Sequence, residues 1–164
     1  MPNKEYRSNL VALSKSGYEI VDNEPDIRKW SVRNAEGKTL GVVDDLIIDK
    51  RLRKVRYIIL DLSGRPLNLI SRKVLIPIGI SQFDDMDDVV ILPTITLEHL
   101  ATIPSYTGSI KWNEERKIRR LFSAPDPNKH VDYDDQYEDD HFYDDEQFND
   151  SNYYNRGRKH RYAE

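Results

Sequence analysis

Residues 37–62 constrain the fold more than any other stretch, because they hold two apolar runs separated by a short charged segment. The runs 42–48 and 55–62 are rich in Val, Ile, Leu and Tyr, residue types that suit a pleated and half-buried surface. Residues 50–53 between them, Lys-Arg-Leu-Arg, are typical of a turn. The pattern predicts two β-strands joined by a charged turn.

The second of these strands has apolar side chains on both faces. Successive residues of a strand point to opposite sides, so Val55, Tyr57 and Ile59 share one face. Ile58 and Leu60 lie on the other face. We therefore expect this strand to be covered on both sides.

Further short strands are predicted on either side of this pair, at 18–21, 27–33, 74–80 and 89–92. Gly37 closes a hairpin turn after residue 34, where glycine accommodates a positive φ. Gly41 marks a bulge or a close backbone approach. Pro77 cannot donate a ladder hydrogen bond, so its strand is expected at an edge or a bulge. Residues 82–88 are predicted to be a loop, and Thr96 to cap a short helical turn.

The charge of the chain is divided unevenly between its two parts. Residues 125–164 hold 12 Asp and Glu against 5 Lys and Arg, whereas residues 1–124 hold 17 against 20. The net charge of −4 thus combines a basic body with an acidic tail. The chain has no cysteine, which excludes disulfides and thiolate metal sites, and no apolar run suggests a signal peptide or a membrane span. We expect a cytoplasmic protein.

Four segments follow from these patterns. Residues 1–17 are predicted to be an N-terminal arm, for which a mobile terminus is favoured over a short packed helix. Residues 18–106 form a β-domain, and residues 107–123 a linker and a helix. Residues 124–164 mix acidic residues with six tyrosines but have no apolar periodicity, which predicts a disordered tail.

The helix is predicted over residues 113–122. Asn113 suits the N-cap, Glu114 and Glu115 the positive end of the helix dipole, and basic residues the other end. Ile118, Leu121 and Phe122 form an apolar stripe that should dock on the β-domain or on a partner.

The order of these landmarks resembles the PRC-barrel domain. The resemblance rests on the strand with Trp30, the segments G-K-T-L-G-V-V-D-D-L-I-I-D, V-R-Y-I-I-L, V-L-I-P-I and D-D-V-V-I-L, and the endings L-E-H-L and I-P-S-Y. It covers residues 18–106. Related barrels occur in the photosynthetic reaction-centre H subunit and in a ribosome maturation factor, but the chain looks more like stand-alone bacterial members. The resemblance implies an all-β fold: a small PRC-type β-barrel, here with a short C-terminal helix and a disordered acidic tail.

Several acidic and histidine residues are candidates for metal or catalytic sites, but a structural role is favoured for each. Asp84, Asp85, Asp87 and Asp88 lack the order of a calcium-binding loop and suit a solvated turn. Asp44, Asp45 and Asp49 suit a barrel rim, and His99 a surface turn. Tail residues Asp139, Asp140, His141, Asp144 and Asp145 suit a plain acidic segment. We expect no metal site, no cofactor and no enzymatic activity.

The remaining candidate is a partner-binding surface on the helix, formed by Lys111, Trp112, Arg116, Lys117, Arg119 and Arg120. Our leading hypothesis is a non-enzymatic adaptor, stress- or envelope-associated, that acts through contacts with an unidentified protein partner or a second copy. The alternative is an RNA- or ribosome-associated assembly factor, in which the basic helix meets phosphates and Trp112 stacks on bases.

Overall fold

The computed structural model describes residues 9–20, 26–62, 72–84, 86–122 and 146–148. The strands are β1 (Leu10–Ala12), β2 (Ser31–Asn34), β3 (Thr39–Asp49), β4 (Lys54–Leu62), β5 (Arg72–Pro77), β6 (Gln82–Asp84) and β7 (Val89–Leu92). The helices are α1 (Leu13–Ser16), α2 (Leu97–Thr102) and α3 (Trp112–Phe122), with short 3-10 turns η1 (Ile78–Ile80) and η3 (Glu146–Phe148). Strands dominate and the helices are short, so the all-β prediction is confirmed.

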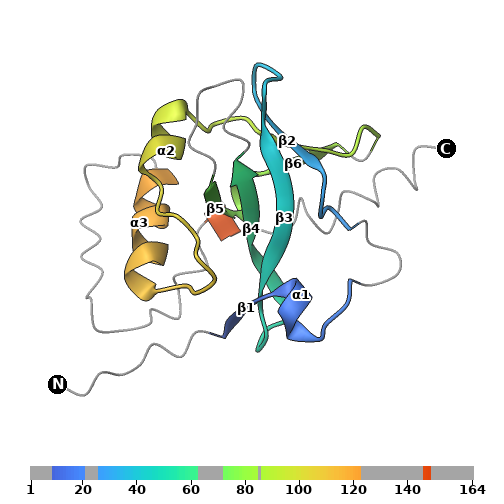
Figure 1. Ribbon diagram of the computed structural model, residues 1–164, viewed down its shortest axis with the longest axis vertical. Helices are drawn as coiled ribbons and strands as arrows, with labels where there is room; N and C mark the ends of the chain where they lie inside the picture. The colour runs from blue at the N-terminus through green and yellow to red at the C-terminus, as the bar shows by residue number, and fades with distance from the viewer. Residues whose placement is uncertain (1–8, 21–25, 63–71, 85, 123–145, 149–164) are drawn as a thin grey trace.

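All seven strands belong to one sheet, in the order β5-β4-β3-β2-β7-β6, with β1 paired to β3 beside this path. The neighbours are antiparallel except for β2 and β7, which run parallel with Val32 opposite Val90. The sheet is therefore mixed. In Figure 1 the long strands β3 and β4 cross the middle of the molecule, with α2 and α3 together on one side.

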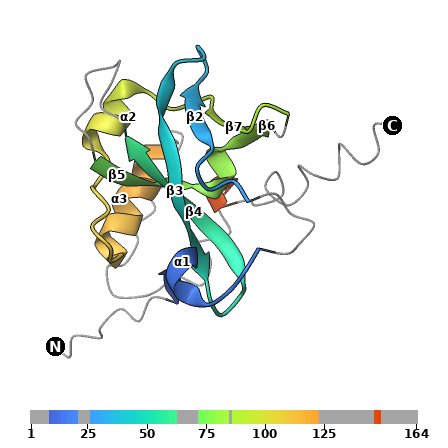
Figure 2. The same ribbon diagram turned by 45° about the vertical axis from the view of Figure 1, so that its right-hand side comes forward.

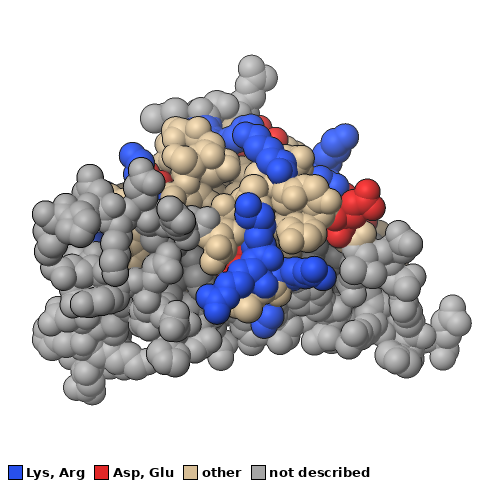
Figure 3. All heavy atoms as spheres, turned by 90° about the horizontal axis from the view of Figure 1, so that it is seen from below, with Lys and Arg blue, Asp and Glu red and all other residues tan. Residues whose placement is uncertain are grey.

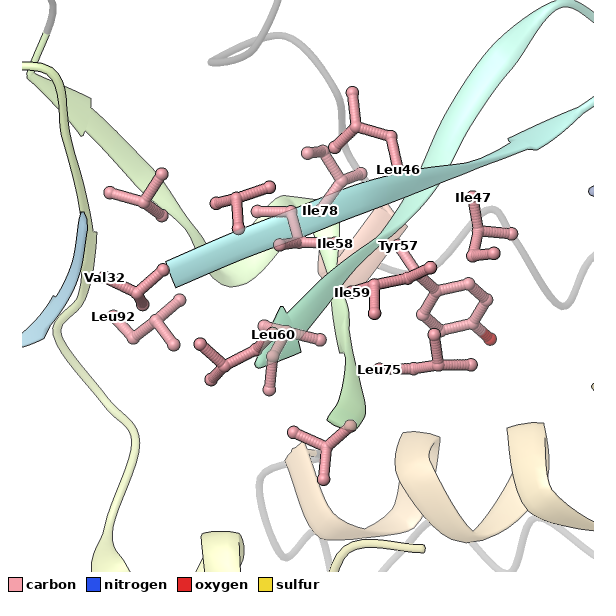
Figure 4. Packing of buried hydrophobic residues seen from close by; sticks show 14 of the residues in the cluster. Val32, Leu46, Ile47, Tyr57, Ile58, Ile59, Leu60, Leu75, Ile78 and Leu92 are labelled. Carbon is pink, nitrogen blue, oxygen red and sulfur yellow. The ribbon is translucent and has the colours of Figure 1, made fainter. Parts of the chain in front are cut away.

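The central hairpin is the one that the sequence predicts. β3 and β4 pair antiparallel from Gly41 opposite Leu62 to Asp49 opposite Lys54, and residues 50–53 make the turn. Residues 55–60 of β4 are all buried, so the strand is covered on both faces as expected. Tyr57 is fully buried and packs among aliphatic side chains from neighbouring strands, as Figure 4 shows.

Two special residues of the sheet behave as predicted. A Cβ at Gly41 would lie 1.9 Å from the carbonyl oxygen of Asp61, so the two backbones approach too closely for any side chain. Pro77 is the last residue of β5, which lies at one end of the strand order of the sheet. Beyond β5, Tyr106 N donates to Lys73 O at 2.8 Å and Ser105 forms a bridge with Val74, so part of this edge is covered.

The boundaries of several elements differ from the sequence prediction. Residues 18–20 are not a strand; the first strand among the described residues is β1, which lies in the segment that the sequence analysis assigned to a mobile arm. β1 pairs with the end of β3, and Ala12 and Leu13 are buried, because a short apolar patch can join a distant strand. Residues 82–84, predicted to be loop, form β6 on β7. β2 starts at Ser31, since residues 28–29 form a turn with Lys29 at φ 74°.

Part of the predicted disordered tail packs on the body. In η3, Gln147 is 4% exposed and Phe148 is 2% exposed, and Phe148 belongs to the main hydrophobic core. The prediction of disorder is therefore wrong for these residues, because one aromatic side chain is enough to anchor a polar segment in an apolar site. The other predictions for residues 123–145 and 149–164 lie outside the described residues.

Candidate partner interface

Helix α3 begins earlier than predicted. The carbonyl oxygen of Lys111 accepts from the backbone N–H of Glu114 at 3.0 Å and of Glu115 at 3.1 Å. Asn113, the predicted N-cap, therefore lies inside the first turn. The helix runs from Trp112 to Phe122, with its acidic residues in the first turn and Arg119 and Arg120 in the last, as the dipole favours.

The inner face of α3 holds a buried carboxylate whose burial the sequence analysis did not predict. Ile118 is 1% exposed and packs in the core, whereas Leu121 and Phe122 are only half-buried. Glu115 is fully buried, and Tyr57 Oη donates to its Oε1 at 2.9 Å. Since Tyr57 stands at the centre of the sheet, this bond ties the helix to the core.

Turn η3 adds further contacts between α3 and the sheet. The ring of Phe148 lies edge-on to the ring of Tyr57, with 5.3 Å between centroids and 85° between planes. Gln147 Nε2 donates to the carbonyl oxygen of Arg119 at 2.9 Å, so η3 contacts both the sheet and α3. We refer to Tyr57, Glu115, Gln147 and Phe148 as the helix anchor.

The six predicted partner-binding residues do not form one uniformly exposed surface. Lys111, Lys117 and Arg120 are exposed, whereas Trp112, Arg116 and Arg119 are half-buried. Nε of Arg116 and both Nε and Nη1 of Arg119 are buried, and both side chains make further contacts. We call Lys117 and Arg120 of α3, together with Lys111 immediately before the helix, the α3 cationic face, because these three present their charges to solvent.

Helix α2 connects the sheet to α3 through His99. Thr96 caps α2 as predicted: His99 N donates to Thr96 Oγ1 and Thr96 N donates to His99 Nδ1, both at 3.1 Å. The His99 ring also lies 5.2 Å from the ring of Phe122 in α3, at an interplanar angle of 63°. His99 thus has a structural role at the junction of the two helices.

Arg72 of β5 holds the other end of α2. Its Nη1 donates to Ile103 O at 2.6 Å and to Ser105 Oγ at 3.0 Å, and its Nη2 donates to Leu100 O. These carbonyls lie at the C-terminal end of α2, where a guanidinium is favoured. Partial burial lowers the pKa of Arg72 from its ordinary value.

The acidic residues of β3 serve structural contacts. Asp45 is 6% exposed and accepts from Ser14 Oγ at 2.5 Å and from Leu46 N at 2.8 Å. Asp49 accepts from two N–H groups of the following turn and lies 3.7 Å from Nη2 of buried Arg56. Asp49 is the last residue of β3, whereas Asp45 lies within the strand.

Asp44 of β3 forms an ion pair with Lys73 of β5, across the intervening strand β4. The Nζ of Lys73 lies 3.0 Å from Oδ2 of Asp44, and the hydrogen bond between them raises the pKa of Lys73. Tyr106 lies at the same edge, and its pKa is raised chiefly by burial and also by the charge of Asp45. Both shifts follow from local structure and do not require a catalytic role.

The acidic loop before β7 also forms an ordinary turn. Asp84 Oδ1 accepts from Met86 N at 3.0 Å and from Asp87 N at 3.3 Å, and Asp88 has φ 53°. Within the described ranges, no group of three His, Asp or Glu side chains is placed to hold a metal ion. Asp85 and the tail candidates 139–145 lie outside those ranges.

The fold and these contacts define a small β-rich module with a helical cover on one side. Residues 22–99 match the sequence model of the PRC-barrel domain family, so this chain carries a PRC-barrel domain. The match contains the central hairpin and most of the sheet, and it ends within α2. No curated protein matched the chain. In the part of the chain that the structure describes, no helix is long and apolar enough to cross a membrane.

Proposed function

We propose that the protein is a non-enzymatic, cytoplasmic PRC-barrel adaptor that binds a protein partner through the α3 cationic face. The observation that carries the proposal is the helix anchor, which fixes α3 on the barrel domain while Lys111, Lys117 and Arg120 remain exposed. A surface that is held rigidly loses less conformational entropy when a partner binds. The geometry therefore suits recognition by a fixed helix face.

The contacts of the acidic residues support the non-enzymatic part of the proposal. General acid–base catalysis requires a titratable group that can reach a substrate. Asp45 and Asp49 are buried and bonded to nearby backbone and side-chain groups, and Asp44 is paired with Lys73. These contacts explain the three aspartates by structural roles, with no need for a catalytic one.

Binding to RNA or to a ribosomal particle is the second candidate, and the exposed cations of α3 are the observation that favours it. Three surface cations provide a salt-dependent attraction to phosphates. Trp112, however, is half-buried and packs against the core, so its ring is only partly accessible for base stacking. We therefore rank this candidate below the protein adaptor.

The test compares the full-length protein with a triple variant, Lys111→Ser, Lys117→Ser and Arg120→Ser, in native-lysate gradient fractionation and affinity purification. Arg116 and Arg119 are left unchanged, because their guanidinium groups are partly buried and their loss would disturb the fold. The matched control replaces three exposed cations in the β3–β4 turn and at the start of β4: Lys50→Ser, Arg51→Ser and Lys54→Ser.

An adaptor should migrate in a defined complex that survives nuclease treatment, disappears in the α3 variant and persists in the control. Migration with ribosomal subunits that high salt abolishes would support the second candidate instead. Migration of the wild-type protein as an isolated monomer under every condition would refute both candidates.

A further inference from the structure

The turn between β3 and β4 forms a second basic surface. We call it the hairpin tip: Lys50, Arg51, Leu52, Arg53 and Lys54, all five of which are exposed. In Figures 1 and 2 this turn lies at one end of the molecule, whereas α3 lies along the side of the sheet. Figure 3 looks at that end and shows Lys and Arg side chains gathered on it.

Local contacts hold the hairpin tip in one shape. Asp49 Oδ1 accepts from Arg51 N at 2.9 Å and from Leu52 N at 3.1 Å, an arrangement that fixes the turn. Lys50 N donates to Asn9 O at 2.9 Å. The guanidinium carbon of Arg53 lies 5.8 Å from the ring centre of Tyr18. The tip is therefore presented on a fixed support at the end of the sheet's longest strand pair.

The charge of the hairpin tip is not neutralised by its nearest buried carboxylate. Asp49 is 6% exposed, points into the turn and pairs with buried Arg56 at 3.7 Å. Lys15 of α1 is exposed and adds a cation near this end, and Glu19, beside Tyr18, is an exposed acidic neighbour. The tip thus keeps a cluster of four cations, in a chain whose overall charge is negative.

Leu52 decides which kind of anion this surface suits. It lies in the middle of the tip, 54% exposed, with two cations on each side along the chain. An apolar side chain surrounded by Lys and Arg fits the interface of a bilayer, where cations meet lipid phosphates and the apolar group enters the acyl boundary. Single-stranded RNA would instead favour aromatic stacking groups, and Tyr18, an aromatic residue beside the tip in the described part of the chain, already contacts Arg53.

We propose that the hairpin tip is a peripheral membrane-binding site for anionic phospholipid surfaces. Lys50, Arg51, Arg53 and Lys54 contact the headgroup phosphates, and Leu52 inserts between them. This site does not depend on the proposed adaptor function, since it uses no residue of α3.

The experiment is co-sedimentation of the full-length protein with vesicles of 30% phosphatidylglycerol in phosphatidylcholine, and with vesicles of pure phosphatidylcholine. Binding is expected only to the anionic vesicles, and it should weaken strongly between 50 mM and 500 mM salt. The tip variant carries Lys50→Gln, Arg51→Gln, Arg53→Gln and Lys54→Gln. Each cation contributes about fivefold to membrane affinity, so the variant should bind roughly 500-fold more weakly.

A second variant, Leu52→Ser, tests insertion without changing charge. It should bind the anionic vesicles about tenfold more weakly than the wild-type protein. The matched control is Lys111→Gln, Lys117→Gln and Arg120→Gln, which removes exposed cations from α3 and should retain binding within about twofold of the wild-type protein. Far-UV circular dichroism of each variant checks that the fold is kept.

Four results would contradict the proposal. The wild-type protein could fail to sediment with anionic vesicles at 50 mM salt, or the α3 control could lose as much binding as the tip variant. An unstructured RNA homopolymer could also bind the tip more tightly than vesicles at equal phosphate concentration, which would assign the surface to nucleic acid. Retention of full binding by Leu52→Ser would likewise contradict insertion of this residue.

Discussion

Gly41 shows how one residue fixes the geometry of the central hairpin. Its α-carbon faces the backbone of β4 so closely that an added Cβ would meet the carbonyl oxygen of Asp61 at 1.9 Å. Backbone atoms cannot move aside as a flexible side chain can, so the two strands would have to separate. The identity of this residue is therefore a requirement of strand pairing.

We predict that Gly41→Ala lowers the free energy of unfolding by about 3 kcal/mol or more, because it forces overpacking in the sheet. Urea denaturation followed by circular dichroism measures this change. The matched control is Gly37→Asn, at a turn position with φ +81° and open space around it, where asparagine is tolerated. Equal losses in the two variants would show that the close approach is not what makes Gly41 necessary.

Phe148 is the residue that most changes the description of the C-terminal region. Its ring is 2% exposed and packs edge-on against Tyr57. Phe148→Ala should lower the free energy of unfolding by about 3 kcal/mol, because it leaves a cavity beside the core. The control is Met86→Ala, since Met86 is 80% exposed and its truncation should change stability little. A Phe148→Ala protein as stable as the wild type would mean that η3 does not contribute to the core.

At the scale of elements, the edge formed by β5 and residues 105–106 carries two groups whose pKa values are raised. The hydrogen bond with Asp44 raises the pKa of Lys73, and burial raises the pKa of Tyr106. The folded state therefore holds both protons more tightly than the unfolded state does. The corresponding stability is fully present below about pH 10 and is lost as the pH rises through the raised pKa values.

We therefore predict that the free energy of unfolding falls above about pH 10, and that Tyr106→Phe makes the fall less steep because phenylalanine cannot ionise. Urea denaturation at several pH values from 8 to 11 measures the slope. Lys73→Gln is a parallel variant that removes the ion pair. If neither substitution changes the slope, the alkaline loss arises elsewhere in the chain.

Elements that depend on local pattern were predicted well from the sequence. The central hairpin, β7, the cap of α2 at Thr96 and the edge position of Pro77 each leave a signal within a few neighbouring residues. β1 and β6 were missed because each has only three residues and is stabilised by a strand that the local sequence does not identify. Short strands are defined by their partners.

The candidate site also shows that local sequence patterns do not reveal contacts between distant residues. The sequence identified a basic amphipathic helix, and α3 is present with Ile118 in the core. It did not reveal that Glu115 is buried, since Tyr57, whose hydroxyl donates a hydrogen bond to the Glu115 carboxylate, is 58 positions away in the chain. The pattern of charges likewise did not distinguish Arg116 and Arg119, which are half-buried, from the exposed cations.

At the scale of the whole molecule, the helix anchor changes where the stable body ends. The sequence divides the chain after residue 123, but Gln147 and Phe148 are part of the packed structure. A chain shortened after Phe122 loses these contacts with Tyr57 and α3. A chain shortened after Phe148 keeps them.

We predict that the shorter chain, residues 1–122, unfolds at a temperature about 10 °C below that of the full chain, since the loss of Phe148 alone costs about 3 kcal/mol. Residues 1–148 should unfold within a few degrees of the full chain. Thermal unfolding followed by circular dichroism compares the three proteins. The same midpoint for all three would place the end of the stable body before η3.

The parallel pairing of β2 with β7 has a consequence for the order in which the chain folds. Strands β3, β4 and β5 pair with strands that are next to them in the sequence. The side of β2 that faces away from β3, however, gains its hydrogen-bonding partner only from residues 89–92 of β7. Contacts between distant segments form late and slow the folding of β-rich domains. During synthesis on the ribosome, β2 would therefore expose unpaired N–H and C=O groups until β7 emerges, and that interval is when the nascent chain is most open to wrong strand partners.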